Sequence, residues 1–104
     1  MTTFAVIGDL SLDIAVAPSA ARRIGSDTPA TVRIGPGGQG ANVAVRLARQ
    51  GADVCLVAAL ADDAAGRLLR ETVEAEHVRL ATLPAARSTA VVVLLDEAGE
   101  RTML

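Results

Sequence analysis

The sequence predicts an α/β fold in which helices pack on a partial parallel sheet. Segments with the period of a strand alternate along the chain with segments that have the period of a helix. The residues are 51% hydrophobic but only one, Phe4, is aromatic, so Ala, Val, Leu and Ile must build the core. A chain of 104 residues has the size of one small domain. We therefore expect one folding unit over residues 1–104.

The first quarter of the chain predicts two strands and a loop. Phe4–Ile7 is an apolar run that ends at Gly8-Asp9, which indicates a buried strand in the middle of a sheet. Apolar and other residues alternate over Leu12–Val16, the pattern of a strand with two unlike faces, and Pro18 ends it. Residues 19–30 have no sustained period and predict an irregular loop.

The middle of the chain predicts a strand, a helix and a further strand. Thr31–Ile34 is β-branched and runs into a glycine-rich turn at residues 35–40. Apolar residues recur at helical spacing over Ala41–Gln50, and Gly51 supplies a C-terminal stop. Asp53–Ala59 has the pattern of a buried strand, so this succession favours a parallel crossover unit.

The last part predicts a capped helix and a hairpin. Asp62 or Asp63 is expected to cap a helix that ends near Glu76. The hairpin turn is expected at residues 96–99. The strands expected after the helix are His77–Leu83, Thr89–Leu95 and Arg101–Leu104.

Charge and composition argue against several classes of partner. Twelve acids stand against ten bases, all of them arginine and scattered along the chain, so no nucleic-acid footprint or basic membrane anchor is expected. The absence of lysine excludes a lysine general base or Schiff base. No signal peptide and no apolar run of about 20 residues is evident. We expect a cytoplasmic protein in which the single Cys55 is a buried structural thiol.

The glycine-rich turn at residues 35–40 fits one known nucleotide-binding pattern. Gly35, Gly37 and Gly40 satisfy the dinucleotide-binding pattern, after a strand and before a helix. That pattern requires an acid about twenty residues further on, but Cys55–Val57 is apolar. A dinucleotide-binding (Rossmann) oxidoreductase fragment is therefore disfavoured and stays as an alternative.

Blocks along the whole chain resemble the ribokinase-like (PfkB-type) carbohydrate kinases. They are GDLSLD at residues 8–13, GGQGAN at 37–42, DDAAG at 62–66 and DEAGERT at 96–102. The resemblance implies a ribokinase-like fold, with a partial central parallel sheet, flanking helices and a small β-sheet lid that closes over a sugar. The strands expected in this lid are residues 12–16, 31–34, 89–95 and 101–104.

The same resemblance implies a set of substrate-binding residues. It places Asp13 on sugar hydroxyls, which a carboxylate binds through charge-assisted hydrogen bonds, and Asn42 on the same sugar. Gly38 and Gly40 would let backbone approach the ligand closely. Without the resemblance, Asp13 reads as an edge-strand surface residue, Asn42 as a helix cap and the glycines as a turn. The full implied set is Ser11, Asp13, Gly38, Gln39, Gly40 and Asn42.

Two positions depart from the family pattern. Ser11 stands where the family commonly has Asn, and Ala61 stands where it commonly has Gly before the paired acids. The first departure bears on which sugar hydroxyls are recognised. Gly38–Asn42 lies closest to the form found in ribokinases, so ribose is the first expectation, with fructose or a nucleoside left open.

The resemblance also implies what this chain does not supply. The family's C-terminal Gly-Ala-Gly-Asp segment, which provides the catalytic Asp, is absent from the sequence. We expect no catalytic residue, cofactor site or metal site here, and ATP and Mg²⁺ are implied only for the complete enzyme. The chain then reads as the sugar-binding, N-terminal part of an ATP-dependent kinase acting on a sugar hydroxymethyl group, inactive by itself.

Two further expectations concern partners. The alternative to a kinase fragment is a protein of another functional class, a non-catalytic module that binds a sugar or a nucleoside. Lid sheets pair between subunits in the family, so the resemblance also allows a homodimer through the lid strands.

Overall fold

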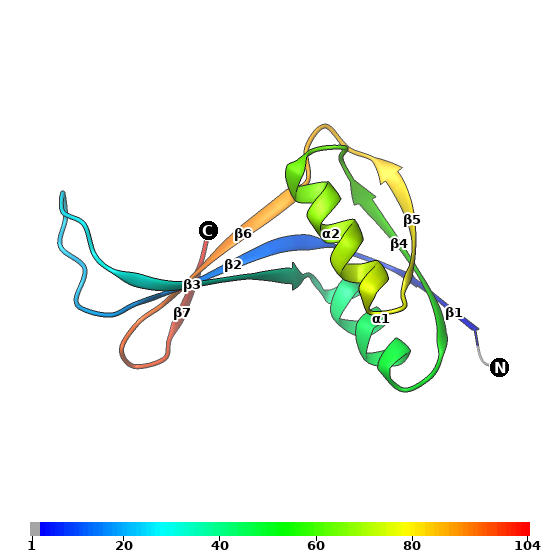
Figure 1. Cartoon of the computed structure of the whole chain (residues 1–104), viewed down its shortest axis with the longest axis horizontal. Helices are drawn as coiled ribbons and strands as arrows, with labels where there is room; N and C mark the ends of the chain where they lie inside the picture. Colours follow the sequence, from blue (N-terminus) through cyan, green and yellow to red (C-terminus); the bar gives the residue numbers. More distant parts are fainter. Residues whose placement is uncertain (1–2) are drawn as a thin grey trace.

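The computed structural model describes residues 3–104 and contains two β-sheets and two helices. Both helices lie beside one of the sheets, and the other sheet extends away from them (Figure 1). In chain order the elements are β1 (Thr3–Ile7), β2 (Ser11–Pro18), β3 (Ala30–Gly37), α1 (Gln39–Arg49), β4 (Asp53–Leu60), α2 (Ala64–Ala75), β5 (Arg79–Pro84), β6 (Thr89–Leu95) and β7 (Arg101–Met103).

The first sheet, here called the core sheet, is parallel and has the order β1-β4-β5. Alternate residues of β4 are buried, as the period of a strand requires when one face is covered. Val54 and Leu56 are fully buried and belong to one apolar cluster with Leu69 and Val73 of α2 and Ala44 of α1. The hydrophobic core therefore lies between the two helices and one face of the core sheet.

The position of β1 corrects the sequence-based expectation. The run Phe4–Ile7 was expected in the middle of a sheet, but β1 lies at the edge and pairs only with β4 among residues 3–104. Its side chains are largely exposed, Ile7 to 81%. The opposite face of the core sheet, which carries Cys55 and Val57, is also only partly covered. An apolar run predicts that a strand has buried neighbours, but it does not say which chain segment supplies them.

The expected crossover unit is also wrong in its pairing. β3 pairs antiparallel with β2, in register Ser11↔Gly37, and not with β4. The parallel partner of β4 is β1, so the crossover runs from β1 through β2, β3 and α1 before it reaches β4. Periodicity identified each of these elements, but it carries no information on the partner of a strand.

The second sheet, here called the projecting sheet, has the order β3-β2-β6-β7. β2 and β6 are parallel, whereas the β2–β3 and β6–β7 pairs are antiparallel. It contains the four segments that the family resemblance places together, and Leu104 continues the pairing by exchanging backbone hydrogen bonds with Val92. The predicted fold class, a parallel sheet with flanking helices and a separate small sheet, is confirmed.

The two faces of the projecting sheet differ in chemistry. Ser11 and Asp13 point to one face, because they alternate with Leu12 and Ile14 along β2. The other face is apolar. By strand register it carries Leu12, Ile14, Val16, Val32, Ile34, Ala90, Val92 and Leu94.

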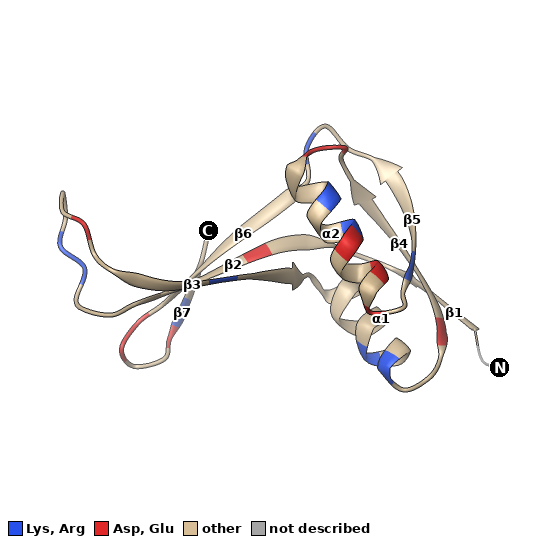
Figure 2. Cartoon of the chain, viewed as in Figure 1, with Lys and Arg blue, Asp and Glu red and all other residues tan. Residues whose placement is uncertain are grey.

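Charged residues are spread over the molecule. Figure 2 shows acidic and basic segments intermixed on α2 and in the loops, with no single basic face. Within residues 3–104, no helix has both the length and the apolar character needed to cross a membrane.

Candidate functional site

A pocket of about 360 Å³ lies where the two sheets meet. It lies near the carboxyl ends of the parallel strands β1 and β4, the edge at which open α/β sheets commonly bind ligands. The residues that line it are Asp9, Leu10, Ser11, Asp13, Gly38, Ala59, Thr89, Val91 and Met103. Three of the predicted substrate residues, Ser11, Asp13 and Gly38, are therefore brought together.

Ser11 and Asp13 form a hydrogen-bonded polar pair in this pocket. Ser11 is 5% exposed, and its Oγ donates a hydrogen bond of 2.8 Å to Oδ1 of Asp13. Among residues 3–104, Oδ2 of Asp13 accepts no hydrogen bond. Gly37, opposite Ser11 on β3, leaves room for this carboxylate, because a β-carbon at residue 37 would collide with it. Asp13 is thus held through one oxygen and can offer the other to a ligand.

The glycines at the start of α1 allow a close contact between two backbone segments. Gly38 has φ 93°, and a β-carbon there would lie 2.5 Å from the carbonyl oxygen of Asp9. A β-carbon at Gly40 would lie 2.7 Å from the carbonyl carbon of Gly8. The backbone N–H of Ala41 donates to the Asp9 carbonyl at 3.1 Å. The immediate neighbour of both glycines is the Gly8–Asp9 loop, and their expected contact with a sugar stays a prediction.

Gln39 and Asn42 lie outside this pocket. Gln39 is exposed and borders a separate hollow beside β1, together with Ile7 and Val43. Asn42 is exposed, and its backbone N–H donates to the Gly38 carbonyl as part of the first turn of α1. Neither side chain joins Ser11 and Asp13 within this chain.

The structure adds lining residues that the sequence did not single out. Asp9 lies two residues after the end of β1, and a polar residue near the carboxyl end of a parallel strand is a signal that could have found it. Thr89 and Met103 reach the pocket only because β6 pairs with β2 and β7 pairs with β6. No local pattern could have predicted these two.

The chemistry of the lining suits a neutral polyhydroxyl ligand. Two carboxylates, Asp9 and Asp13, and two hydroxyl groups, Ser11 and Thr89, line the pocket, and no arginine does. A carboxylate accepts strong hydrogen bonds from ligand hydroxyls. A phosphate group in the same place would meet negative charge without a cation to balance it.

A second polar cluster joins α2 to the segment that enters β6. Oδ1 of Asp63 accepts from the backbone N–H of Gly66, and Oδ2 accepts from the backbone N–H of Ser88, each at 2.8 Å. Oγ of Ser88 in turn accepts from the backbone N–H of Ala61 at 3.1 Å. Of the two predicted caps, Asp62 and Asp63, the N-cap of α2 is Asp63, which is also a link to the projecting sheet. Hydrogen bonds from Ser88, and then from Gly66, hold the pKa of Asp63 below its ordinary value.

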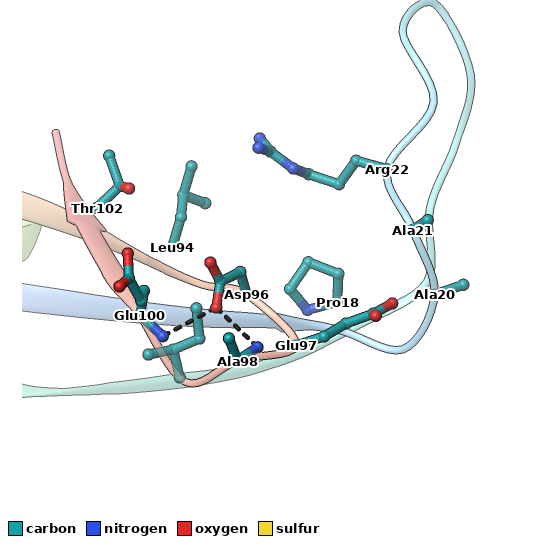
Figure 3. Close-up of a pocket in the computed structure, with 11 residues that line it drawn as sticks. Pro18, Ala20, Ala21, Arg22, Leu94, Asp96, Glu97, Ala98, Glu100 and Thr102 are labelled. Atoms are coloured by element: carbon teal, nitrogen blue, oxygen red, sulfur yellow. Dashed lines mark hydrogen bonds between the residues drawn. The ribbon is translucent and has the colours of Figure 1, made fainter.

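Another pocket, of about 460 Å³, lies at the far end of the projecting sheet. Figure 3 shows Arg22 of the loop after β2 extending over Leu94, with the β6–β7 turn beneath. Oδ1 of Asp96 accepts from the backbone N–H groups of Ala98 and Glu100, each at 2.9 Å, which shapes the turn. None of the predicted substrate residues lines this pocket.

Gly40→Ala should destabilise the fold, because the added methyl group meets backbone that cannot move aside. Overpacking of this kind costs about 1–3 kcal/mol of unfolding free energy, measurable by urea denaturation. Gly35→Ala is the matched control, since no atom lies within 4 Å of a β-carbon there. That control should be neutral or stabilising by up to about 1 kcal/mol. Equal losses in both variants would contradict this assignment.

The lowered pKa of Asp63 predicts a contribution to acid sensitivity. Because the pKa is lower in the folded state than in the unfolded state, the stabilisation is present above the unfolded pKa and is lost as pH falls through the folded pKa. Below about pH 4, the stability of the wild-type chain should therefore fall more steeply than that of Asp63→Asn. Glu76, whose pKa is lowered by Arg49, adds a similar pH dependence to both proteins, so its contribution cancels in the difference between them. Parallel pH profiles of urea stability would refute the prediction.

Comparison with known proteins places these features in one family. The description "pfkB family carbohydrate kinase" matches residues 1–104. Over 70 residues the chain is 44% identical to a fructokinase of Klebsiella pneumoniae and 41% identical to a fructokinase of Salmonella typhimurium, covering 64% of this chain and 23% of each relative. The chain thus spans about a quarter of the curated relatives that it matches.

Solved structures agree on the fold. A carbohydrate kinase from Agrobacterium tumefaciens matches with a TM-score of 0.86 at 22% identity, over 100% of this chain and 35% of that one. Ribokinase from Cryptococcus neoformans, solved with ADP, matches with a TM-score of 0.72 at 26% identity, over 100% of this chain and 34% of that one. With the family description matched along its whole length, this chain belongs to the pfkB family of carbohydrate kinases.

Proposed function

We propose that this chain is the sugar-binding part of an ATP-dependent carbohydrate kinase that phosphorylates a sugar hydroxymethyl group. The observation that carries the proposal is the pocket between the two sheets, lined by two carboxylates and two hydroxyl groups without a basic side chain. Such a lining favours a neutral sugar over a phosphate-bearing ligand. Family membership supplies the reaction class.

Asp13 is the central ligand of the sugar in this proposal. Ser11 holds Oδ1, so the carboxylate keeps one orientation while Oδ2 accepts from a sugar hydroxyl. Gly38 contributes backbone at the pocket wall. Gly40, Gln39 and Asn42 stay assigned to substrate binding by resemblance alone, because they lie outside the pocket lining.

The nucleotide and the metal ion are assigned elsewhere. The pocket offers no cation to a triphosphate, and residues 3–104 hold no group of three or more side chains able to ligate a metal ion. These residues therefore do not fit ATP or Mg²⁺. We place both, together with the catalytic Asp, in the part of the kinase that the longer relatives possess, and we expect this chain alone to be inactive.

Fructose and ribose are the two sugars to test first. The glycine-rich segment favoured ribose, whereas the curated relatives that align at 41–44% identity are named fructokinases. Solved structures named ribokinase also match, but at identities of 16–26%. We therefore place fructose ahead of ribose. A nucleoside ranks lower, since the pocket lining has no aromatic side chain for stacking a base.

The projecting sheet would act as a lid over this sugar and as a pairing surface between subunits. Its apolar face packs toward the core at Leu12 but leaves Val32 and Ile34 53% and 58% exposed. An apolar sheet face of this kind is stabilised when a second copy covers it. A cytoplasmic location without nucleic-acid or membrane partners completes the proposal.

Sugar binding tests the function directly. The wild-type chain should bind fructose or ribose in calorimetric titration, and Asp13→Ala should weaken the Kd about tenfold or more through the loss of charge-assisted hydrogen bonds. Gly37→Ala should act in the same direction, because its methyl group displaces the Asp13 carboxylate. Asp27→Ala, in the exposed loop after β2, is the control and should leave the Kd unchanged.

An assay of phosphate transfer from ATP to the sugar distinguishes a kinase part from a non-catalytic binding module. Binding without turnover by this chain, with turnover restored when the rest of a kinase is supplied, supports the proposal. Binding that never leads to turnover supports the non-catalytic module. An equal Kd in the wild type and Asp13→Ala argues against the assigned pocket.

Pairing through the projecting sheet has its own test. In sedimentation velocity the chain should show a concentration-dependent dimer that Ile34→Glu abolishes, because a buried unpaired carboxylate is costly. Leu83→Glu is the control, since Leu83 is a 56% exposed hydrophobic residue on β5, a strand of the core sheet. A monomer at every concentration, or equal dissociation in both variants, would rule out this interface.

A further inference from the structure

Chain crossings between the two sheets are fixed in two different ways. The β1–β2 and β3–α1 connections are held against each other by backbone, through the Ala41 to Asp9 hydrogen bond and the contact of Gly40 with Gly8. The β5–β6 connection, residues 85–88, is instead held by a side chain, that of Asp63 at the N-cap of α2. It is the crossing that delivers β6, and with it Thr89 and Val91, to the sugar pocket.

Asp63 does more at this position than a helix cap requires. Capping of α2 uses only Oδ1, which accepts from Gly66. Oδ2 accepts from Ser88, the residue that directly precedes Thr89 and the start of β6. Ser88 is also tied through Oγ to the backbone of Ala61, at the end of β4. The carboxylate of Asp63 therefore links α2 to the segment that enters the projecting sheet, and Ser88 extends this link to the end of β4 in the core sheet.

The packing around this cluster leaves little freedom. Gly66 faces the Ala61 carbonyl so closely that a β-carbon would overlap it, and the Ser88 Oγ lies 2.9 Å from that β-carbon position. Leu12 packs against the core cluster near the base of β2, so the projecting sheet has an apolar contact as well. The apolar contact of Leu12 does not fix the orientation of the sheet, because hydrophobic contacts are non-directional. The hydrogen bonds of Asp63 restrain both the donor–acceptor distance and the angle at the hydrogen atom.

We propose that Asp63 is a positioning residue for sugar binding, because its second carboxylate oxygen clamps Ser88 and so sets the place of β6 over the sugar pocket. This inference rests on the proposed function, since the consequence for sugar requires a sugar to bind there. When the hydrogen bond from Ser88 to Asp63 is lost, the projecting sheet keeps its backbone contact at Gly8 and Gly40, and the hydrogen bond between Ser88 Oγ and Ala61 is left to restrain the start of β6. Thr89 and Val91 then occupy a range of positions.

Asp63→Asn separates the two roles of the residue. Asn is as good an N-cap as Asp, so its side-chain oxygen can still accept from Gly66. Its amide group, however, places N–H donors opposite the backbone N–H of Ser88, where no hydrogen bond can form. Asp62→Asn is the matched control, because Asp62 is 97% exposed in its side chain and reaches only Arg67, at 3.5 Å.

The first measurement is the distance between the core and the projecting sheet, without any ligand. In a Cys55→Ser background, spin labels go on Glu71→Cys of α2 and Glu97→Cys of the β6–β7 turn, both exposed in the chain. We expect a broader distance distribution in Asp63→Asn than in the wild type, with unchanged helix content by circular dichroism. Asp62→Asn should match the wild type. Equal widths in all three, or broadening in both variants, would overturn the proposal.

The second measurement is sugar affinity in the same variants. A fall of the binding-competent fraction to about a third raises the apparent Kd about threefold, and we expect a change of at least that size in Asp63→Asn only. An unchanged Kd in a broadened Asp63→Asn overturns the link to the sugar pocket. Failure of the wild type to bind any sugar overturns the proposed function, and the distance measurement then still decides on the clamp.

Discussion

The contact between the Gly8–Asp9 loop and the first turn of α1 determines how the two sheets meet. At this point the chain leaves β1 for the projecting sheet and returns from it into α1. The two passages lie so close that side chains at residues 38 and 40 would overlap backbone. Because the loop also bonds to the helix through the Asp9 carbonyl, both ends of the β2–β3 hairpin are held against the core sheet.

The polar pocket follows from that arrangement. Asp9 lies at the end of β1, and Ser11 and Asp13 lie at the start of β2, so a connection of a few residues presents two carboxylates to the same space. Strand alternation directs Asp13 to the pocket side and leaves Leu12 on the side that packs toward the core. The proposed recognition of sugar hydroxyl groups and the attachment of the projecting sheet thus use opposite faces of one strand.

The helices and their ends could be predicted from the sequence, whereas the pairing of strands that are far apart in the chain could not. The helices, the cap at Asp63 and the stop at Gly51 follow from spacing and from residue types that act over a few positions. The edge position of β1 and the separation of β3 from β4 depend on contacts across tens of residues, which periodicity does not encode. Within the site, Ser11 and Asp13 were predicted from motif likeness, but Thr89 and Met103 required the order of the projecting sheet.

The separation of Asn42 from Asp13 bears on how selective this chain can be. Asp13 lines the pocket from one side, while Asn42 stands exposed on the helix surface beyond Gly38. The polar side chains of the pocket, Asp9, Ser11, Asp13 and Thr89, come from β2, β6 and the loop after β1, so a bound sugar would be contacted from the side of those segments. Discrimination between sugars needs polar groups that would stay unpaired with the wrong ligand. Selectivity therefore requires surfaces on the other sides of the ligand. The partly covered face of the core sheet and the exposed edge of β1 are where protein outside these residues would have to pack to supply them.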